Sequence, residues 1–317
     1  MSQHVVVLGA GAMGSLFGGL LAEGGMKVTL IDPWQEHIAA IQKNGLQMVG
    51  FGGDRFIPIG ATTVPAEIES ADVVFVQCKA NFNAAAAKSI QHLFTADTDT
   101  VAISFQNGLG NEEELAEYFG EDRVLGGLTA QGANVEGPGV IRNHAELPSY
   151  IGEMAGGISD RSTEIAAALT AAGLPTEPSE HIRLDIWRKL MANIAISAAS
   201  GITGLNIGQI FNQHLADDVS YAALDEACAV ANAAGVELTA DEAKEILGKI
   251  AGPNGTPGNK SSLRVDIENK RPSEIDYING AVVKLGIKHG VPVPVNQTLV
   301  TLVHGLQAHY LNTDNTE

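Results

Sequence analysis

The chain has 317 residues, 45% of them apolar and 18% charged, so it can bury a substantial core and its composition argues against disorder. At roughly 150 residues per domain, this length predicts about two domains. Lys and Arg total 19 against 37 Asp and Glu, and the resulting net charge of −18 argues against a surface for nucleic acid or an anionic membrane. A locally positive pocket for an anionic ligand stays compatible with that charge.

Cysteine usage and the N-terminus point to a reducing compartment. Cys78 and Cys228 form neither a metal-ligand spacing nor a disulfide framework. The N-terminus lacks the basic and apolar regions of a signal peptide, and the longest apolar runs are far shorter than the roughly 18 residues of a membrane span. We therefore expect a soluble, cytoplasmic protein that does not bind nucleic acid, membrane or metal.

The first half of the chain alternates two kinds of segment. Short, mostly apolar runs, typical of strands buried on both faces, occur at 5–8, 28–31, 73–76 and 101–105. Segments that favour helices lie at 13–22, 36–43, 84–93 and 112–119. This alternation predicts a doubly wound parallel sheet. Shorter runs between 124 and 151, around Gly-Pro-Gly at 137–139, predict a meander at the sheet edge.

The pattern changes after residue 178, where only helices are predicted, at 181–200, 215–234, 240–250, 261–270, 274–289 and 297–310. The predicted fold class is α/β, with an N-terminal Rossmann-type parallel sheet domain over 1–178 and a C-terminal all-α domain over 179–317. Ligands tend to bind in a cleft between two such domains. The apolar helix faces would serve either the helical core or a homodimer interface.

A glycine-rich motif, G-x-G-x-x-G, joins the first predicted strand to the first predicted helix. It comprises Gly9, Ala10, Gly11, Ala12, Met13 and Gly14. The first glycine would allow a tight turn, the second the close approach of a pyrophosphate, and the third close packing of helix on strand. The helix N-terminus adds free N–H donors for the phosphates. The motif predicts a dinucleotide site, the alternative being a glycine-rich turn without a ligand.

Asp32 ends the second predicted strand, 18 residues after Gly14. An acidic residue at that place hydrogen-bonds the adenine ribose hydroxyls and would repel a 2′-phosphate. No Arg or Lys follows between Asp32 and Ile41. We therefore predict NAD (as NADH) in preference to NADP; the alternative is that Asp32 only caps the next helix.

A second group of polar residues lies in the first helix of the C-terminal half. Lys189, Asn193 and Ser197 are spaced i, i+4, i+8 and share one face of a helix that is otherwise apolar there. Such a polar stripe favours a face turned to a cleft, whereas a lysine taken alone favours a snorkelling surface role. Glu274 lies at the start of a later predicted helix. The alternative to a role in the site is an acidic residue in the first turn that the helix dipole stabilises.

Together these segments resemble the ketopantoate reductase (2-dehydropantoate 2-reductase) family, in family order and over nearly the whole chain. The matching motifs are V-L-G-A-G-A-M-G at 7–14, C-K-A at 78–80, Q-N-G-L-G at 106–110, W-R-K-L-x-x-N at 187–193, S-S-L at 261–263 and E-I-D-Y-I-N-G at 274–280. The resemblance implies a Rossmann domain followed by an all-helical domain.

The resemblance also implies roles for individual residues. Lys189 matches the general acid that protonates the carbonyl oxygen as hydride reaches C2. Asn193 and Ser262 match positions that hold the substrate, and Asn107 matches an asparagine between nicotinamide and substrate. An ammonium group suits this step because ketone reduction builds alkoxide charge on the oxygen.

Three further positions match the cofactor side of the family's site. Lys79 and Glu274 match residues that contact the cofactor or organise the active site, Glu274 also counting among the catalytic candidates. Ala133, in T-A-Q-G-A at 129–133, matches a backbone contact to the cofactor.

This sequence departs from the family pattern at three places. Ser197 stands where many members carry Asn, and the later substrate-side Asn falls at Asn206 or aligns with Ile207. Asp32 is the third departure, because well-known members use a nearby Arg and NADP. The first two differences lie on the side that recognises the substrate, so Ser197 stays a substrate-binding candidate.

The sequence thus predicts an NAD(P)H-dependent reductase of a 2-oxo acid, with 2-dehydropantoate reduced to (R)-pantoate as the leading reaction. One alternative is a D-2-hydroxyacid dehydrogenase of the same family acting on another branched or aromatic 2-oxo acid. A dinucleotide sensor without catalysis is an alternative of another class. A decarboxylating 3-hydroxyacid dehydrogenase shares the architecture, but the motifs at 106–110 and 274–280 point away from it.

Overall fold

The computed structural model describes residues 4–212, 215–252 and 255–311. The chain forms two compact units. The first comprises Met1–Gln106 and Asn111–Arg183, and the second comprises Asn107–Gly110 and Leu184–Glu317. The short segment 107–110 therefore leaves the first unit and packs with the second.

An eight-stranded sheet organises the first unit. Its order is β12 (Thr176–Pro178), β11 (Ser149–Glu153), β8 (Val124–Thr129), β7 (Val101–Ser104), β6 (Val73–Val76), β1 (His4–Leu8), β2 (Lys27–Ile31) and β5 (Gly60–Thr62). All neighbouring pairs are parallel except β11 with β8. The predicted parallel Rossmann-type sheet is confirmed, and the four predicted apolar runs form its centre.

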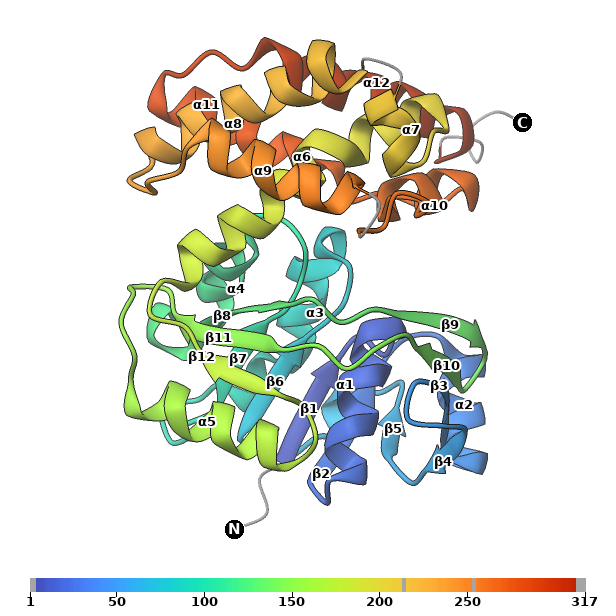
Figure 1. Cartoon of the computed structure of the whole chain (residues 1–317). Helices are drawn as coiled ribbons and strands as arrows, with labels where there is room; N and C mark the ends of the chain where they lie inside the picture. The colour runs from blue at the N-terminus through green and yellow to red at the C-terminus, as the bar shows by residue number, and fades with distance from the viewer. Residues whose placement is uncertain (1–3, 213–214, 253–254, 312–317) are drawn as a thin grey trace, which may run out of the picture. The chain divides into compact units, whose positions relative to one another are not determined.

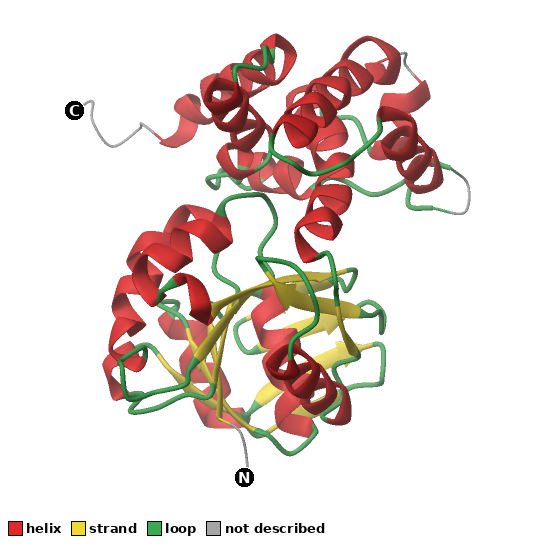
Figure 2. Ribbon diagram, turned by 90° about the vertical axis from the view of Figure 1, so that its left-hand side faces the viewer, coloured by secondary structure: helices red, strands yellow, loops and turns green. Residues whose placement is uncertain are grey.

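Helices cover both faces of this sheet (Figures 1 and 2). Side chains of β1 alternate, so Val5 and Val7 pack with α1 (Ala12–Glu23) and α5 (Asp160–Ala171) in one cluster. Val6 and Leu8 pack with α3 (Asn83–Ile90) and α4 (Asn111–Phe119) in another. Burial on both faces explains why these strands are mostly apolar without a polar alternation.

A second, four-stranded sheet was not predicted. Its order is β4 (Arg55–Ile57), β3 (Leu46–Gly50), β10 (Val140–Asn143) and β9 (Ala133–Gly137). In the chain, β3 and β4 come directly after α2 (Gln35–Asn44). The predicted edge meander is therefore wrong in detail, because β8 and β11 join the large sheet whereas β9 and β10 join the small one. Parallel pairing of Val140 with Gln47 brings together segments far apart in sequence.

The described part of the second unit contains only helices as regular elements, which confirms the predicted fold class. They are α6 (Ile182–Thr203, which starts at the end of the first unit), α7 (Ile207–Asn212), a π-helical turn (Ala216–Ser220), α8 (Tyr221–Ala233), α9 (Ala240–Ala251), α10 (Ser262–Glu268), a 3₁₀ turn (Ile275–Tyr277), α11 (Asn279–His289) and α12 (Pro294–Leu311). The single helix predicted at 274–289 is broken at Ile278, whose φ of −105° and ψ of −98° are not helical.

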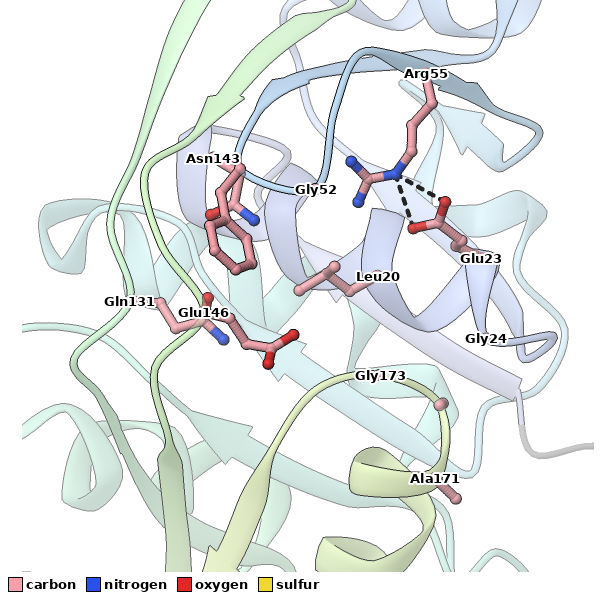
Figure 3. Close-up of a pocket in the computed structure, with 12 residues that line it drawn as sticks. Leu20, Glu23, Gly24, Gly52, Arg55, Gln131, Asn143, Glu146, Ala171 and Gly173 are labelled. Atoms are coloured by element: carbon pink, nitrogen blue, oxygen red, sulfur yellow. Dashed lines mark hydrogen bonds and ion pairs between the residues drawn. The ribbon is translucent and has the colours of Figure 1, made fainter.

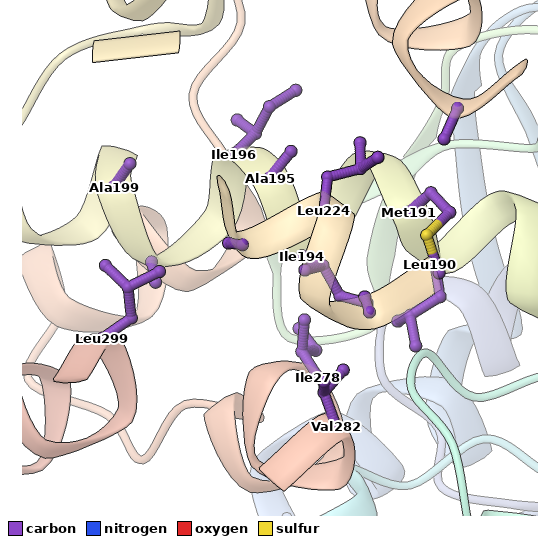
Figure 4. Packing of buried hydrophobic residues seen from close by; sticks show 14 of the residues in the cluster. Leu190, Met191, Ile194, Ala195, Ile196, Ala199, Leu224, Ile278, Val282 and Leu299 are labelled. Carbon is purple, nitrogen blue, oxygen red and sulfur yellow. The ribbon is translucent and has the colours of Figure 1, made fainter. Parts of the chain in front are cut away.

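The core of the second unit surrounds α6 (Figure 4). Leu190, Met191 and Ile194 of α6 belong to one buried cluster with Leu224 of α8 and Val282 of α11. None of the helices in the described ranges is long and apolar enough to cross a bilayer.

Two buried asparagines fix α6 against its neighbours. The Asn279 side chain donates to the Ile194 carbonyl of α6 at 3.0 Å and to Asn296 Oδ1 of α12 at 2.9 Å. Asn296 in turn donates to Glu226 of α8 at 2.7 Å. Buried polar groups that find partners in this way specify one arrangement of helices.

Candidate active site

The glycine loop adopts the geometry its motif requires. Gly9 has φ of +104°, and a Cβ there would lie 2.4 Å from the Cys78 nitrogen. A Cβ on Gly14 would lie 1.9 Å from the Gly9 carbonyl oxygen. A Cβ on Gly11, by contrast, meets nothing within 4 Å. Two glycines therefore permit close packing, whereas Gly11 leaves open space at the N-terminus of α1.

Asp32 contacts the glycine loop directly. Its Oδ2 accepts a hydrogen bond from the Ala10 N–H at 2.8 Å, and its Oδ1 accepts one from the Trp34 N–H at 2.9 Å. Trp34, not Asp32, is the N-cap residue of α2. The carboxylate thus lies at the C-terminal end of β2 beside the loop, where a ribose would be held.

Two buried residues that the sequence did not indicate support the same loop. Ser15 donates to the Ala10 carbonyl at 2.8 Å and lies 3.2 Å from His37 Nε2. His37 Nδ1 accepts from the Gly139 N–H at 3.0 Å. Since Gly139 is 102 residues from His37 in sequence, no local pattern could have found this contact.

The ends of β6 and β7 are joined by a side-chain network. Gln106 donates to the Cys78 carbonyl at 2.7 Å and to Asn83 Oδ1 at 2.6 Å. Gln106, the first residue of Q-N-G-L-G, therefore contacts the C-K-A motif within the first unit. Lys79, half-buried, is the N-cap residue of a 3₁₀ turn, Ala80–Phe82. Ala133 is the first residue of β9.

Lys189 and Glu274 interact within the second unit. Lys189 lies half-buried in α6, and Glu274 occupies the N-cap position of the 3₁₀ turn before α11. Burial of the ammonium lowers the pKa of Lys189 to about 8, although the nearby Glu274 carboxylate opposes the change. A lysine with such a pKa can hold and release a proton near neutral pH.

The polar face of α6 continues beyond Lys189. Because α6 is unbroken to Thr203, Asn193 and Ser197 follow at successive turns, and Ser197 is buried. Ser261, the N-cap residue of α10, donates to the Ser197 carbonyl at 3.4 Å. Ser262 is the exposed first residue of α10. The S-S-L motif is thus anchored to α6 by Ser261, which the sequence had not singled out.

The segment 107–110 packs against the motif that carries Glu274. The Leu109 N–H donates to the Tyr277 carbonyl at 2.8 Å, and a Cβ on Gly108, whose φ is +104°, would lie 2.5 Å from that oxygen. Asn107 is therefore carried by a loop fixed to the second unit, next to Tyr277.

Other features of the described residues lie apart from these positions. A pocket of about 320 Å³ in the first unit is lined by Phe51, Gln131 and the Glu23–Arg55 ion pair, and includes none of the predicted cofactor-binding residues (Figure 3). No cluster of His, Cys, Asp and Glu in the described ranges could hold a metal ion.

The residues of the first unit fit a dinucleotide. Open space at Gly11, free N–H groups at the start of α1 and the Asp32 carboxylate at the end of β2 match a pyrophosphate followed by a ribose. This fold, with a partly buried lysine of lowered pKa on a helical unit, defines a class of Rossmann-type oxidoreductases.

Comparison with known proteins identifies the family within this class of oxidoreductases. The model of the family "Ketopantoate reductase PanE/ApbA" matches residues 5–156, and that of its C-terminal region matches 181–307. A 2-dehydropantoate 2-reductase from Archaeoglobus fulgidus is 36% identical over 308 residues, covering 96% of this chain and 98% of the relative. The chain therefore belongs to the ketopantoate reductase family, a family of oxidoreductases that use NAD(P)H.

Two solved structures share the fold over nearly the whole chain. D-Mandelate dehydrogenase with NADH and anilino(oxo)acetate has a TM-score of 0.90 at 28% identity, covering 97% of this chain and 99% of that one. A ketopantoate reductase from Ralstonia eutropha JMP134 has a TM-score of 0.88 at 30% identity, with the same coverage.

Proposed function

We propose that the chain reduces 2-dehydropantoate to (R)-pantoate with NADH in preference to NADPH. The observation that carries this proposal is the partly buried Lys189, whose pKa is about 8, beside Glu274 and one turn before Asn193. The curated 2-dehydropantoate 2-reductases at 32–36% identity support the choice of substrate. In this proposal residues 1–178 bind cofactor and 179–317 bind substrate.

The cofactor would be held by the glycine loop and by residues at the strand ends. Gly9–Gly14 would take the pyrophosphate, and Asp32 the adenine ribose. Lys79, Asn107 and Ala133 would lie toward the nicotinamide. The preference for NADH rests on the charge of Asp32, which would repel a 2′-phosphate.

Lys189 would act as the general acid. When bound, NADH supplies the hydride that the substrate carbonyl carbon accepts. As that carbon gains the electron pair, negative charge develops on the carbonyl oxygen, and the Lys189 ammonium both stabilises it and donates the proton. Because burial lowers the pKa of Lys189, the proton leaves more readily than from an exposed lysine.

Glu274 would keep Lys189 charged and in place, since its carboxylate favours the ammonium form. Asn193, Ser197 and Ser262 would hold the carboxylate and hydroxyl end of the substrate. Asn107, on the loop fixed to Tyr277, would orient nicotinamide and substrate.

A second candidate is reduction of another branched or aromatic 2-oxo acid to a D-2-hydroxy acid. Ser197 favours it, because a buried serine offers a shorter hydrogen-bonding side chain than asparagine and leaves room for an apolar substrate group. The likeness to D-mandelate dehydrogenase supports the same alternative.

A panel of 2-oxo acids separates these functions. NADH oxidation is followed at 340 nm with 2-dehydropantoate, oxaloacetate, 2-oxoisovalerate and phenylglyoxylate, and we expect the highest kcat/KM with 2-dehydropantoate. A higher kcat/KM with an acid lacking the 4-hydroxyl group would replace the proposed substrate. Binding of NADH without turnover of any acid would instead indicate a dinucleotide sensor.

A variant tests the role of Lys189 separately. Lys189→Ala should lose about two to four orders of magnitude in kcat, the usual contribution of a general acid, while the Kd for NADH stays near its original value. Turnover retained in this variant would remove Lys189 from the proton-transfer step.

A further inference from the structure

Trp34 is an exposed indole beside the predicted nucleotide site. It is the second residue after Asp32 and the N-cap residue of α2, and its side chain makes no capping hydrogen bond. The residue is 39% exposed and belongs to none of the hydrophobic clusters of the described residues. Large aromatic side chains with a free face are typical of binding sites.

His37 supports one face of the indole. The two rings are stacked at 4.8 Å between centroids with an interplanar angle of 14°. Since that face lies on His37, the exposed area of Trp34 belongs to the opposite face and the ring edges.

The supporting His37 is held rigidly. It is fully buried, and its Nδ1 accepts a hydrogen bond from the Gly139 N–H, so Nε2 carries the proton in the neutral ring. Nε2 then donates to Ser15 Oγ at 3.2 Å, and Ser15 donates to the Ala10 carbonyl. Burial lowers the pKa of His37, which favours this neutral form. The base of the indole is thus linked to the glycine loop.

Asp32 gives a second link between Trp34 and the glycine loop. One carboxylate oxygen accepts from the Trp34 N–H at 2.9 Å and the other from the Ala10 N–H at 2.8 Å. These hydrogen bonds hold the backbone of Trp34 next to the carboxylate and the loop, and stacking on His37 orients its indole.

The covalent structure of a nucleotide explains how the glycine loop, Asp32 and Trp34 would contact the same ligand. In adenosine the base is attached to C1′, next to the carbon that bears the 2′-hydroxyl. A ribose whose hydroxyls bind Asp32 therefore places its base within side-chain reach of residues that flank Asp32. Every base has a π-face, and stacking on an aromatic side chain contributes about 1–3 kcal/mol.

We infer that the free face of Trp34 is the stacking platform for the adenine ring of the dinucleotide, with His37 as its fixed support. This assignment rests on the proposed function, because it requires a dinucleotide at the glycine loop. It makes Trp34 a binding residue for the half of the cofactor that takes no part in hydride transfer.

Fluorescence tests the contact without any turnover. The chain has two tryptophans, so Trp187→Phe leaves Trp34 as the only one, and Trp34→Phe leaves Trp187. ADP-ribose, which contains adenine but no nicotinamide, should quench Trp34 emission and leave Trp187 emission nearly unchanged. Nicotinamide mononucleotide, which lacks adenine, should not quench Trp34. Equal effects of both probes on Trp34, or no effect of ADP-ribose, would overturn the assignment.

Calorimetry measures the contribution to affinity. Trp34→Leu keeps apolar bulk but removes the π-face, and should raise the Kd for ADP-ribose about tenfold, whereas Trp34→Phe should change it little. Phe56→Ala is the control, because Phe56 is an exposed aromatic residue of the same unit, on β4. An unchanged Kd in Trp34→Leu overturns the platform but leaves the proposed function standing. If the original chain does not bind ADP-ribose, both fall together.

Discussion

The carboxylate of Asp32 accepts a hydrogen bond from the backbone N–H of Ala10 at 2.8 Å, which joins the end of β2 to the glycine loop. The same side chain is the proposed partner of the adenine ribose. Asp32 therefore has an observed structural contact and a proposed binding contact, and substitutions can separate the two.

Asp32→Ala should lower the free energy of unfolding by about 1–3 kcal/mol, because the buried Ala10 N–H loses a charged acceptor. It should also weaken NADH binding more than NADPH binding. Asp32→Asn keeps one acceptor oxygen and should lose less stability. Urea unfolding and kcat/KM with each cofactor measure the two effects, and an unchanged NADH-to-NADPH ratio in Asp32→Ala would refute the binding role.

Gly14 and Gly11 should respond differently to alanine. A Cβ at Gly14 overlaps the Gly9 carbonyl oxygen, so Gly14→Ala should cost about 1–3 kcal/mol of stability through overpacking. A Cβ at Gly11, whose φ is −65°, meets no atom, so Gly11→Ala should fold normally yet bind dinucleotide more weakly because it fills the pyrophosphate space. Thermal unfolding and ADP-ribose titration distinguish them; similar losses of stability in both would contradict this account.

The rate should depend on pH through Lys189. Its pKa is lowered to about 8, and the proposed proton donor is the ammonium form, so kcat should fall as pH rises through about 8. Glu274→Gln removes the carboxylate that favours the ammonium and should move this alkaline decline to lower pH. Profiles of kcat from pH 6 to 10 provide the measurement, with Glu268→Gln, an exposed carboxylate of α10, as control. A decline that Glu274→Gln does not move would argue against the pairing.

Stability should depend on pH through Glu112, in the first turn of α4. Burial raises the pKa of this carboxyl to about 7, above its ordinary value of 4.5. The folded state then binds the proton more tightly than the unfolded state, so stability should decrease as pH rises from about 4.5 to 7, by at most about 3 kcal/mol. Glu112→Gln should flatten this dependence in urea unfolding and stabilise the chain at pH 8. An unchanged slope would show that the carboxyl ionises freely in the folded state.

The elements that sequence patterns predicted are those buried on both faces or periodic over several turns. β1, β2, β6 and β7 are short, mostly apolar runs, and α6 is long, so each was located to within a few residues. The small sheet was missed because its strands are short and partly exposed, β9 having three exposed residues at 134–136. Its pairing of β3 with β10 depends on contacts between distant segments, which no local pattern records.

The candidate site likewise contains residues that the sequence indicated and residues that only the structure revealed. Spacing and family motifs indicated the glycine loop, Asp32, Lys189 and Glu274 as candidates. Ser15, His37 and Trp34 were not, because their roles depend on stacking and hydrogen bonds to partners that only the fold supplies.

The sequence by itself determined the order of the central strands and long helices, the family and the residue types available for chemistry, because apolar periodicity and motif spacing are local properties of the chain. Only the tertiary structure decided that Asp32 holds the glycine loop, that segment 107–110 is fixed to Tyr277, and that Lys189 loses enough water to lower its pKa. Hydrogen bonds and desolvation depend on which atoms surround a group in space, and that environment exists only once the distant segments have packed together.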